Sequence, residues 1–177
     1  NLKKLPLSLA KKLVFSDPYA CAVFQYERMC DIGEAQNFRV EKARLKCDEK
    51  TARERAITKT FERVVIFGLG TTGLFIGDQI RRGQKDAEIL FAARSGGNSQ
   101  KAKFVKNELG CKYLSTGGLS EKETANAIKE MLGGTASVFI GTSGAETEHK
   151  IAFEHGVLGC NGIYDSFSLG PRVSFDT

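Results

Sequence analysis

The stretch Arg63-Val-Val-Ile-Phe-Gly-Leu-Gly-Thr-Thr-Gly-Leu74 decides the fold of this 177-residue chain. Its first five residues form a continuous apolar run, which is typical of a central parallel strand covered by helices on both faces. Glycines with the spacing G-x-G-x-x-G follow at once, and a segment of helical period comes next. Gly68 permits a tight turn, Gly70 leaves room for a pyrophosphate, and Gly73 lets the helix pack close to the strand. The stretch therefore predicts a dinucleotide-binding turn at a helix N-terminus, with a turn kept only for packing as the alternative.

After residue 62, short β-rich runs alternate with segments of helical period, and this alternation predicts a parallel sheet. We expect strands at 63–67, 88–92, 112–114, 137–141 and 162–167, with a last short one near Val173. We expect helices at 72–82, 99–109, 121–131 and 146–154, the first three ended by glycines. The predicted fold class is α/β, a doubly wound parallel sheet (Rossmann) with an N-terminal helical extension.

The N-terminal third has a different composition, so we divide the chain into residues 1–60 and a dinucleotide-binding domain at 61–177. Apolar residues at 7–29 surround Ser16-Asp17-Pro18, where proline suits the start of a helix, and two short helical pieces are expected there. Residues 37–61 are polar and predict an exposed helix or a partly ordered insertion.

The positive charge of the chain is concentrated in one segment. Residues 39–63 hold nine lysines and arginines against five acids, a local excess of +4 within the net charge of +5. Acids and bases interleave there and aromatic residues are nearly absent, so we favour a solvated helical face over a nucleic-acid surface.

The end of the second predicted strand discriminates between cofactors. An NAD-binding domain presents an acid there, which accepts a hydrogen bond from the ribose 2′-hydroxyl. This chain has no acid at that point and continues Arg94-Ser95-Gly96-Gly97-Asn98. The planar guanidinium of Arg94 can donate two hydrogen bonds to a 2′-phosphate. We therefore expect NADP, with a plain surface arginine as the alternative, and we interpret Lys101 and Lys103 as helix-surface charges.

Small side chains end the fourth and fifth predicted strands, at Thr142-Ser143-Gly144 and Ser166-Phe167-Ser168. Ligands of open parallel sheets lie beyond the carboxyl ends of the strands, so we expect these residues to border the ribose and nicotinamide, unless the turns alone require them. The predicted cofactor-binding residues are Gly68, Gly70, Thr71, Thr72, Gly73, Arg94, Ser95, Thr142 and Ser143. No complete catalytic set is visible, and His149 and His155 are interpreted as surface or capping residues.

Cysteine usage and apolar runs constrain the setting. The five cysteines are widely spread and form no C-x-x-C pair, so we expect reduced, mostly buried thiols and no structural zinc. No run approaches the ~18 apolar residues of a membrane span, and the N-terminus lacks a signal-peptide pattern. We expect a cytoplasmic protein without a membrane or nucleic-acid partner.

The order of these motifs resembles the cofactor-binding domain of the medium-chain dehydrogenase/reductase superfamily, the zinc-type alcohol dehydrogenases. The resemblance covers nearly everything after residue 60 and is carried by residues 64–75, 104–110, 136–145 and 158–163. Upstream, Phe15-Ser-Asp-Pro-Tyr-Ala-Cys-Ala22 is similar to the family's Glu-Pro helix, with Asp17 in place of glutamate. The polar insertion, Arg94 and Asn161-Gly162 resemble the archaeal-type glucose dehydrogenases, which use NADP.

The resemblance implies an NADP-dependent alcohol or sugar dehydrogenase in which zinc polarises the hydroxyl and a hydride passes to the nicotinamide. Only Asp17 could belong to the zinc shell, and an N-terminal helix cap is its alternative role. The family's zinc ligands lie in a preceding catalytic domain, so we expect a chain truncated at both ends, inactive alone and without zinc. Expected partners are that domain and a small-molecule substrate, and a homo-oligomer is left open. A non-catalytic, dinucleotide-sensing regulatory module is the alternative function.

Overall fold

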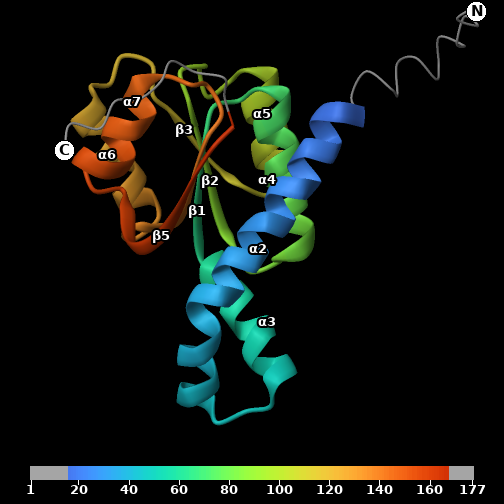
Figure 1. Ribbon diagram of the computed structural model, residues 1–177. Helices are drawn as coiled ribbons and strands as arrows, with labels where there is room; N and C mark the ends of the chain where they lie inside the picture. Colours follow the sequence, from blue (N-terminus) through green and yellow to red (C-terminus); the bar gives the residue numbers. More distant parts are fainter. Residues whose placement is uncertain (1–15, 168–177) are drawn as a thin grey trace, which may run out of the picture.

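Five parallel strands form the sheet that the alternating sequence predicts. The computed structural model describes residues 16–167 (Figure 1). Their sheet has the order β3-β2-β1-β4-β5, and each neighbouring pair is parallel. The strands are β1 Arg63–Phe67, β2 Glu88–Ala93, β3 Lys112–Ser115, β4 Ala136–Gly141 and β5 Leu158–Ser166. The chain proceeds outward from β1 to β3 and then returns to the other side of β1, so the ligand-binding crevice of this topology lies between β1 and β4. The strand expected near Val173 lies outside the described residues.

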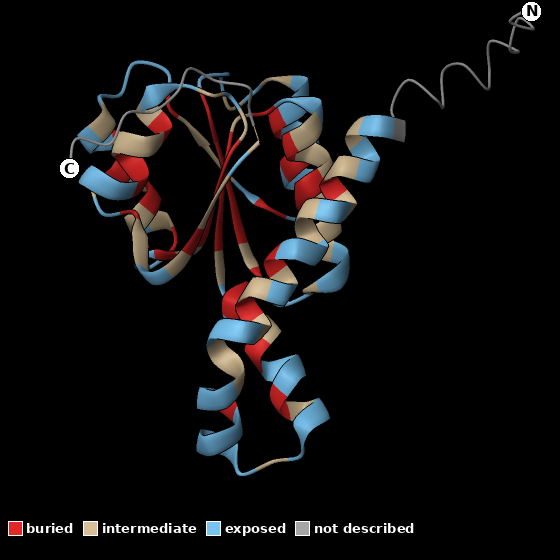
Figure 2. Ribbon diagram, viewed as in Figure 1, coloured by how far each residue is buried: buried red, intermediate tan, exposed pale blue. Residues whose placement is uncertain are grey.

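Helices cover both faces of the sheet, which confirms the doubly wound arrangement. One face carries α2, α4 and α5, and the other carries α6, α7 and the turn that follows α7 (Figure 1). Buried residues lie along the strands and on the helix faces turned toward them (Figure 2). One helix follows each of the first four strands. In chain order they are α4 Thr71–Gly83, α5 Gln100–Asn107, α6 Glu121–Met131 and α7 Glu146–His149.

Local signals explain where these helices begin and end. Ser120 and Glu123 form a capping box, in which each side chain binds the other residue's backbone N–H, and α6 begins at Glu121 as predicted. The expected helix at 146–154 is α7 followed by a π-helical turn at Lys150–Glu154. There the N–H of His155 donates to the carbonyl of Lys150 at 2.9 Å, five residues back.

Residues 16–60 form a helical hairpin, and the expectation of short helical pieces is wrong for the described part. Helix α2 runs without a break over Ser16–Leu45, and α3 runs over Glu49–Thr60. Pro18 lies in the first turn of α2, where it leaves the helix ladder intact. The helix stops beside Lys46, whose φ is 49°. No described helix, α2 included, is long and apolar enough to cross a membrane.

The two halves of α2 have different environments. Its first half lies beside α4, and its second half extends with α3 below the sheet (Figure 1). Ala22 and Met29 from the first half belong to the same buried cluster as β1 and β2. The lower hairpin buries Ala52 and Ala56 and carries ion pairs such as Lys42–Glu49, 2.9 Å apart, and Arg53–Glu34. The expected mixing of acids and bases is therefore present, and many lower-hairpin residues are exposed (Figure 2).

All five cysteines are free, as expected, but most of them are not buried. Only Cys111 is buried, Cys160 is exposed and the other three are half-buried. The expectation of mostly buried thiols was wrong because Cys21 and Cys30 fall on the partly open surface of α2 and Cys47 falls in the loop between α2 and α3.

Gly33 is the point of closest approach between the two hairpin helices. A Cβ added there would collide with the side chain of Thr60. We expect Gly33→Ala to lower the free energy of unfolding by about 1–3 kcal/mol, despite the better helix propensity of alanine. The opposite change at exposed Ala35, Ala35→Gly, should cost about 1 kcal/mol through propensity alone. Urea denaturation of both variants separates the two effects, and a more stable Gly33→Ala variant would contradict the steric account.

Candidate cofactor-binding site

Thr142 holds the glycine turn between the ends of β1 and β4. Its hydroxyl donates to the carbonyl of Phe67 at 3.0 Å, and its N–H donates to the same oxygen at 2.9 Å. Gly68 has a φ of 115°, and a Cβ there would collide with Thr142 Oγ1. Only glycine therefore fits between the strand end and the threonine. The structure places Thr142 beneath the turn, as its support.

Gly70 leaves the N-terminus of α4 open. It is extended, with φ −78° and ψ 173°, and supplies no side-chain cap. The first helical bond of α4 runs from the N–H of Leu74 to the carbonyl of Gly70 at 3.1 Å, so the amides of residues 71–73 precede the helix ladder. A Cβ at Gly70 would meet no atom within 4 Å other than those of its neighbours in the chain. Unsatisfied amides and the positive end of the helix dipole thus border open space, which is the arrangement that binds phosphate.

Gly73 has the packing role that the motif predicts. A Cβ there would lie 3.0 Å from the carbonyl oxygen of Gly68 and 3.4 Å from Ile66 Cγ2. The first turn of α4 therefore lies directly against the strand and the glycine turn. Thr71 and Thr72 stand beside it in the same turn of helix.

A cleft of about 420 Å³ opens over the carboxyl ends of the strands and over this turn. Five of the predicted residues line it: Gly68, Gly70, Arg94, Ser95 and Ser143. The remaining lining residues were not singled out as site residues: Phe67, Leu69, Ala93, Lys101, Thr116, Leu119, Glu121, Thr124, Ala145, Thr147 and Ile151. The structure thus brings the glycine turn, the end of β2 and the end of β4 into one cleft.

A larger groove of about 500 Å³ lies at the opposite end of the sheet, between α3 and the turn at 83–87. Its basic side chains include Arg44 and Lys59, which already pair with Glu41 and Glu62. Of the two, the smaller cleft is the candidate site because it adjoins the glycine turn and the open start of α4.

The end of β2 provides the cationic end of the cleft. Arg94 is exposed there, and within residues 16–167 it makes no ion pair with a carboxylate. The loop after it is held by Tyr113, whose hydroxyl donates to the Ser95 carbonyl at 2.6 Å, and by Lys106, whose ammonium donates to the Gly97 carbonyl at 2.9 Å. Lys101 also lines this cleft, whereas the sequence indicated only a charge on the surface of a helix. Positive charge at this end is therefore free to meet a ligand.

The wall near α6 and α7 mixes apolar and polar side chains. Leu119, Ala145 and Ile151 line it together with threonines. The one carboxylate of the cleft, Glu121, also lies here, at the start of α6. It faces His155, with 3.9 Å between Glu121 Oε2 and His155 Nε2.

Glu148 is a buried carboxyl that sequence reasoning missed. It is 1% exposed, and its Oε1 accepts the N–H of Ser143 at 3.0 Å and the hydroxyl of Ser143 at 2.6 Å. Burial raises the pKa of Glu148, and hydrogen bonds from Ser143 and the Gly144 backbone oppose that rise. A glutamate at the third position of a helix is the one local signal for such a capping role.

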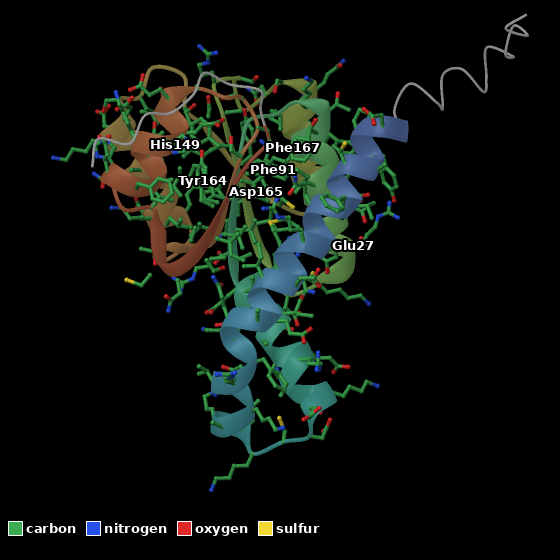
Figure 3. The ribbon with its side chains drawn as sticks, in the orientation of Figure 1. Glu27, Phe91, His149, Tyr164, Asp165 and Phe167 are labelled. Carbon is green, nitrogen blue, oxygen red and sulfur yellow. The ribbon has the colours of Figure 1, made fainter. Side chains whose placement is uncertain are left out.

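An aromatic cluster surrounds this carboxyl. The ring of His149 lies 4.6 Å from the ring of Tyr164 and 5.8 Å from the ring of Phe153, and Figure 3 shows His149 and Tyr164 on the same side of the sheet. Burial and the charge of Glu148 raise the pKa of Tyr164 to about 12. His149 is therefore half-buried in a packed cluster, and the expectation of a surface or capping role is wrong for it.

Asp17 lies exposed in the first turn of α2. Among the described residues, no group of three or more His, Cys, Asp or Glu side chains is placed to hold a metal ion. The proposed zinc-shell role of Asp17 therefore stays a prediction, and no metal chemistry is derived from residues 16–167.

Comparison of the chain with protein-family models, with curated proteins and with solved structures found no match. The Rossmann-like topology is consistent with a nucleotide-binding domain, and the cleft lies where such domains bind their ligands.

Serine substitutions at two neighbouring glycines should have opposite effects on stability. Gly68→Ser places a side chain against Thr142 at a φ of 115°, and we expect it to lower the free energy of unfolding by roughly 1–3 kcal/mol. Gly70→Ser fits the open, extended N-cap position and should leave that free energy unchanged or raise it by up to about 1 kcal/mol. Urea denaturation measures both, and equal losses in the two variants would contradict this account of the turn.

Glu148→Gln should change how stability depends on pH. Because burial raises the pKa of Glu148 above its ordinary 4.5, its stabilising contribution is complete below that value and is lost as the pH rises through the raised pKa. Each unit of the rise corresponds to about 1.4 kcal/mol. The variant should therefore gain stability over the wild type between about pH 4 and pH 7. Urea denaturation across this pH range tests the prediction, with Glu146→Gln on the exposed side of α7 as control. A difference in the free energy of unfolding between Glu148→Gln and the wild type that does not vary with pH would contradict it.

Proposed function

We propose that this chain is the NADP-binding domain of an oxidoreductase that transfers a hydride between a nicotinamide and an alcohol or sugar hydroxyl. The observation that carries nucleotide binding is the open space over Gly70. No atom beyond the adjoining residues of the chain lies within 4 Å of the Cβ position there, and the start of α4 presents its amides to that space. A pyrophosphate at this point would share one cleft with Arg94 and Lys101.

The preference for NADP over NAD follows from charge at the end of β2. A carboxylate at this point would accept from a ribose 2′-hydroxyl and repel a 2′-phosphate. The strand ends instead at Ala93, and Arg94 and Ser95 follow it. The carboxylate of Glu121 belongs to the wall formed by α6. Arg94 with Ser95 and Lys101 would therefore hold the 2′-phosphate.

The reaction class comes from the resemblance of the strand and turn segments to medium-chain dehydrogenases. NADP, when bound, supplies the hydride acceptor at its nicotinamide. The residues of this cleft bind and orient the adenosine and pyrophosphate parts, so their contribution is affinity and position. A preparation of the protein that contains this chain should reduce NADP when supplied with alcohols or aldoses.

Calorimetric titration with NADP and NAD tests the cofactor assignment. We expect NADP to bind about 10- to 100-fold more tightly, the equivalent of one charge-assisted interaction with the 2′-phosphate. Arg94→Asp should remove this preference, because its carboxylate repels the phosphate and accepts from a free 2′-hydroxyl. Lys103→Asp, on the exposed surface of α5 and outside the cleft, is the matched control and should keep the preference.

Gly70→Ser tests the phosphate position itself. The serine hydroxyl would accept hydrogen bonds from the same amide N–H groups that a pyrophosphate needs. Both dinucleotides should therefore bind more weakly to a variant that remains folded. Equal binding of NAD and NADP to the wild type, or an unchanged preference in Arg94→Asp, would show that Arg94 is a plain surface arginine.

A further inference from the structure

Both hydrogen-bond donors of Ser143 are already used within the protein, so its side chain can only accept a hydrogen bond from a ligand. A serine has two donors, the backbone N–H and the hydroxyl. Both donate to Glu148 Oε1, at 3.0 Å and 2.6 Å. The lone pairs of Oγ are what remains for a molecule in the cleft that Ser143 lines. Ser143 is therefore unsuited to a phosphate and suited to a group that donates.

Glu148 holds this arrangement in place. Its carboxyl is 1% exposed and lies against Gly141, where a Cβ would collide with Oε2. Its titratable neighbours are His149, next to it in the chain, and Tyr164, whose hydroxyl lies 3.2 Å from the same Cβ position. Because the carboxyl sits behind Ser143, it acts on a ligand only through that serine. Glu148 is thus a positioning residue.

The cleft is asymmetric in a way that orients a purine nucleotide. Arg94 and Lys101 supply positive charge, whereas Leu119, Ala145 and Ile151 supply apolar surface. A planar base would pack against these apolar side chains. Ser143 lies in the same segment between β4 and α7 as Ala145. The exocyclic group of adenine at C6 is an amino donor, and that of hypoxanthine or guanine is a carbonyl acceptor.

We propose that Ser143, oriented by Glu148, contacts the adenine and not the ribose and nicotinamide expected from the sequence. It accepts a hydrogen bond from the 6-amino group of adenine and discriminates against 6-oxopurines. The inference rests on the proposed function, because it requires that the cleft hold a purine dinucleotide. It adds base selectivity to a site whose charge alone selects the 2′-phosphate. A 6-oxo group would meet an acceptor that cannot supply a proton.

Titration of the chain with NADP and with its hypoxanthine analogue tests the proposal. The wild type should bind NADP about tenfold more tightly than the analogue, as expected for one hydrogen bond replaced by two facing acceptors. Ser143→Ala should bring this ratio close to one. Glu148→Gln should keep it, because the amide oxygen can still accept from both donors of Ser143. Glu148→Met should lower it, because the released hydroxyl can then donate to the 6-oxo group.

The outcomes distinguish this inference from the proposed function. Tight binding of NADP with no discrimination against the analogue overturns the role of Ser143 and leaves NADP binding intact. Absence of NADP binding overturns both. An unchanged ratio in Ser143→Ala overturns the inference even if Glu148→Met does not fold, because Ser143 is exposed and its truncation to alanine leaves no cavity in the core.

Discussion

The carbonyl of Phe67 accepts two hydrogen bonds from Thr142, and the geometry of the cleft depends on this contact. It joins the ends of β1 and β4 at the point where the strand order reverses. The threonine leaves no room for a side chain at Gly68, and the chain turns there into α4, whose first turn packs against the strand. The start of α4 consequently faces the cleft with its first amides open. A residue beneath the turn thus creates a binding position above it.

The cleft combines exposed cationic side chains with a serine held by a buried carboxyl, and the two cost different amounts of free energy. Arg94 and Lys101 are exposed, so their charges cost little to present and act on a phosphate through water-screened attraction. Glu148 is buried, and burying a carboxyl costs free energy that the bonds from Ser143 offset in part. In return, the buried carboxyl fixes the direction in which the Ser143 hydroxyl donates. Charge at one end and hydrogen-bond direction at the other would therefore position a nucleotide along the cleft.

The helical hairpin shows how one element can belong to two environments. The first half of α2 packs into the core of the sheet through Ala22 and Met29, and Gly33 brings it against Thr60 of α3. Beyond that crossing, the hairpin buries small side chains such as Ala52 and Ala56 and is held by ion pairs that are largely exposed. Exposed pairs of this kind contribute about 0–1 kcal/mol each. The lower hairpin should therefore open before the sheet does.

The sequence by itself determined the features that depend on neighbours along the chain. Strand β1 and helix α6 occur at their predicted residues, because apolar period and capping are local properties. The same holds for the open position at Gly70 and for the arginine after β2. Tertiary structure decided the rest. Residues far apart in the sequence decided the length of α2 and the approach of Lys101 to the cleft. The path of the turn after β4 decided the position of Glu148 behind Ser143. Periodicity describes which face of an element is apolar, and only packing decides which polar side chain that face will meet.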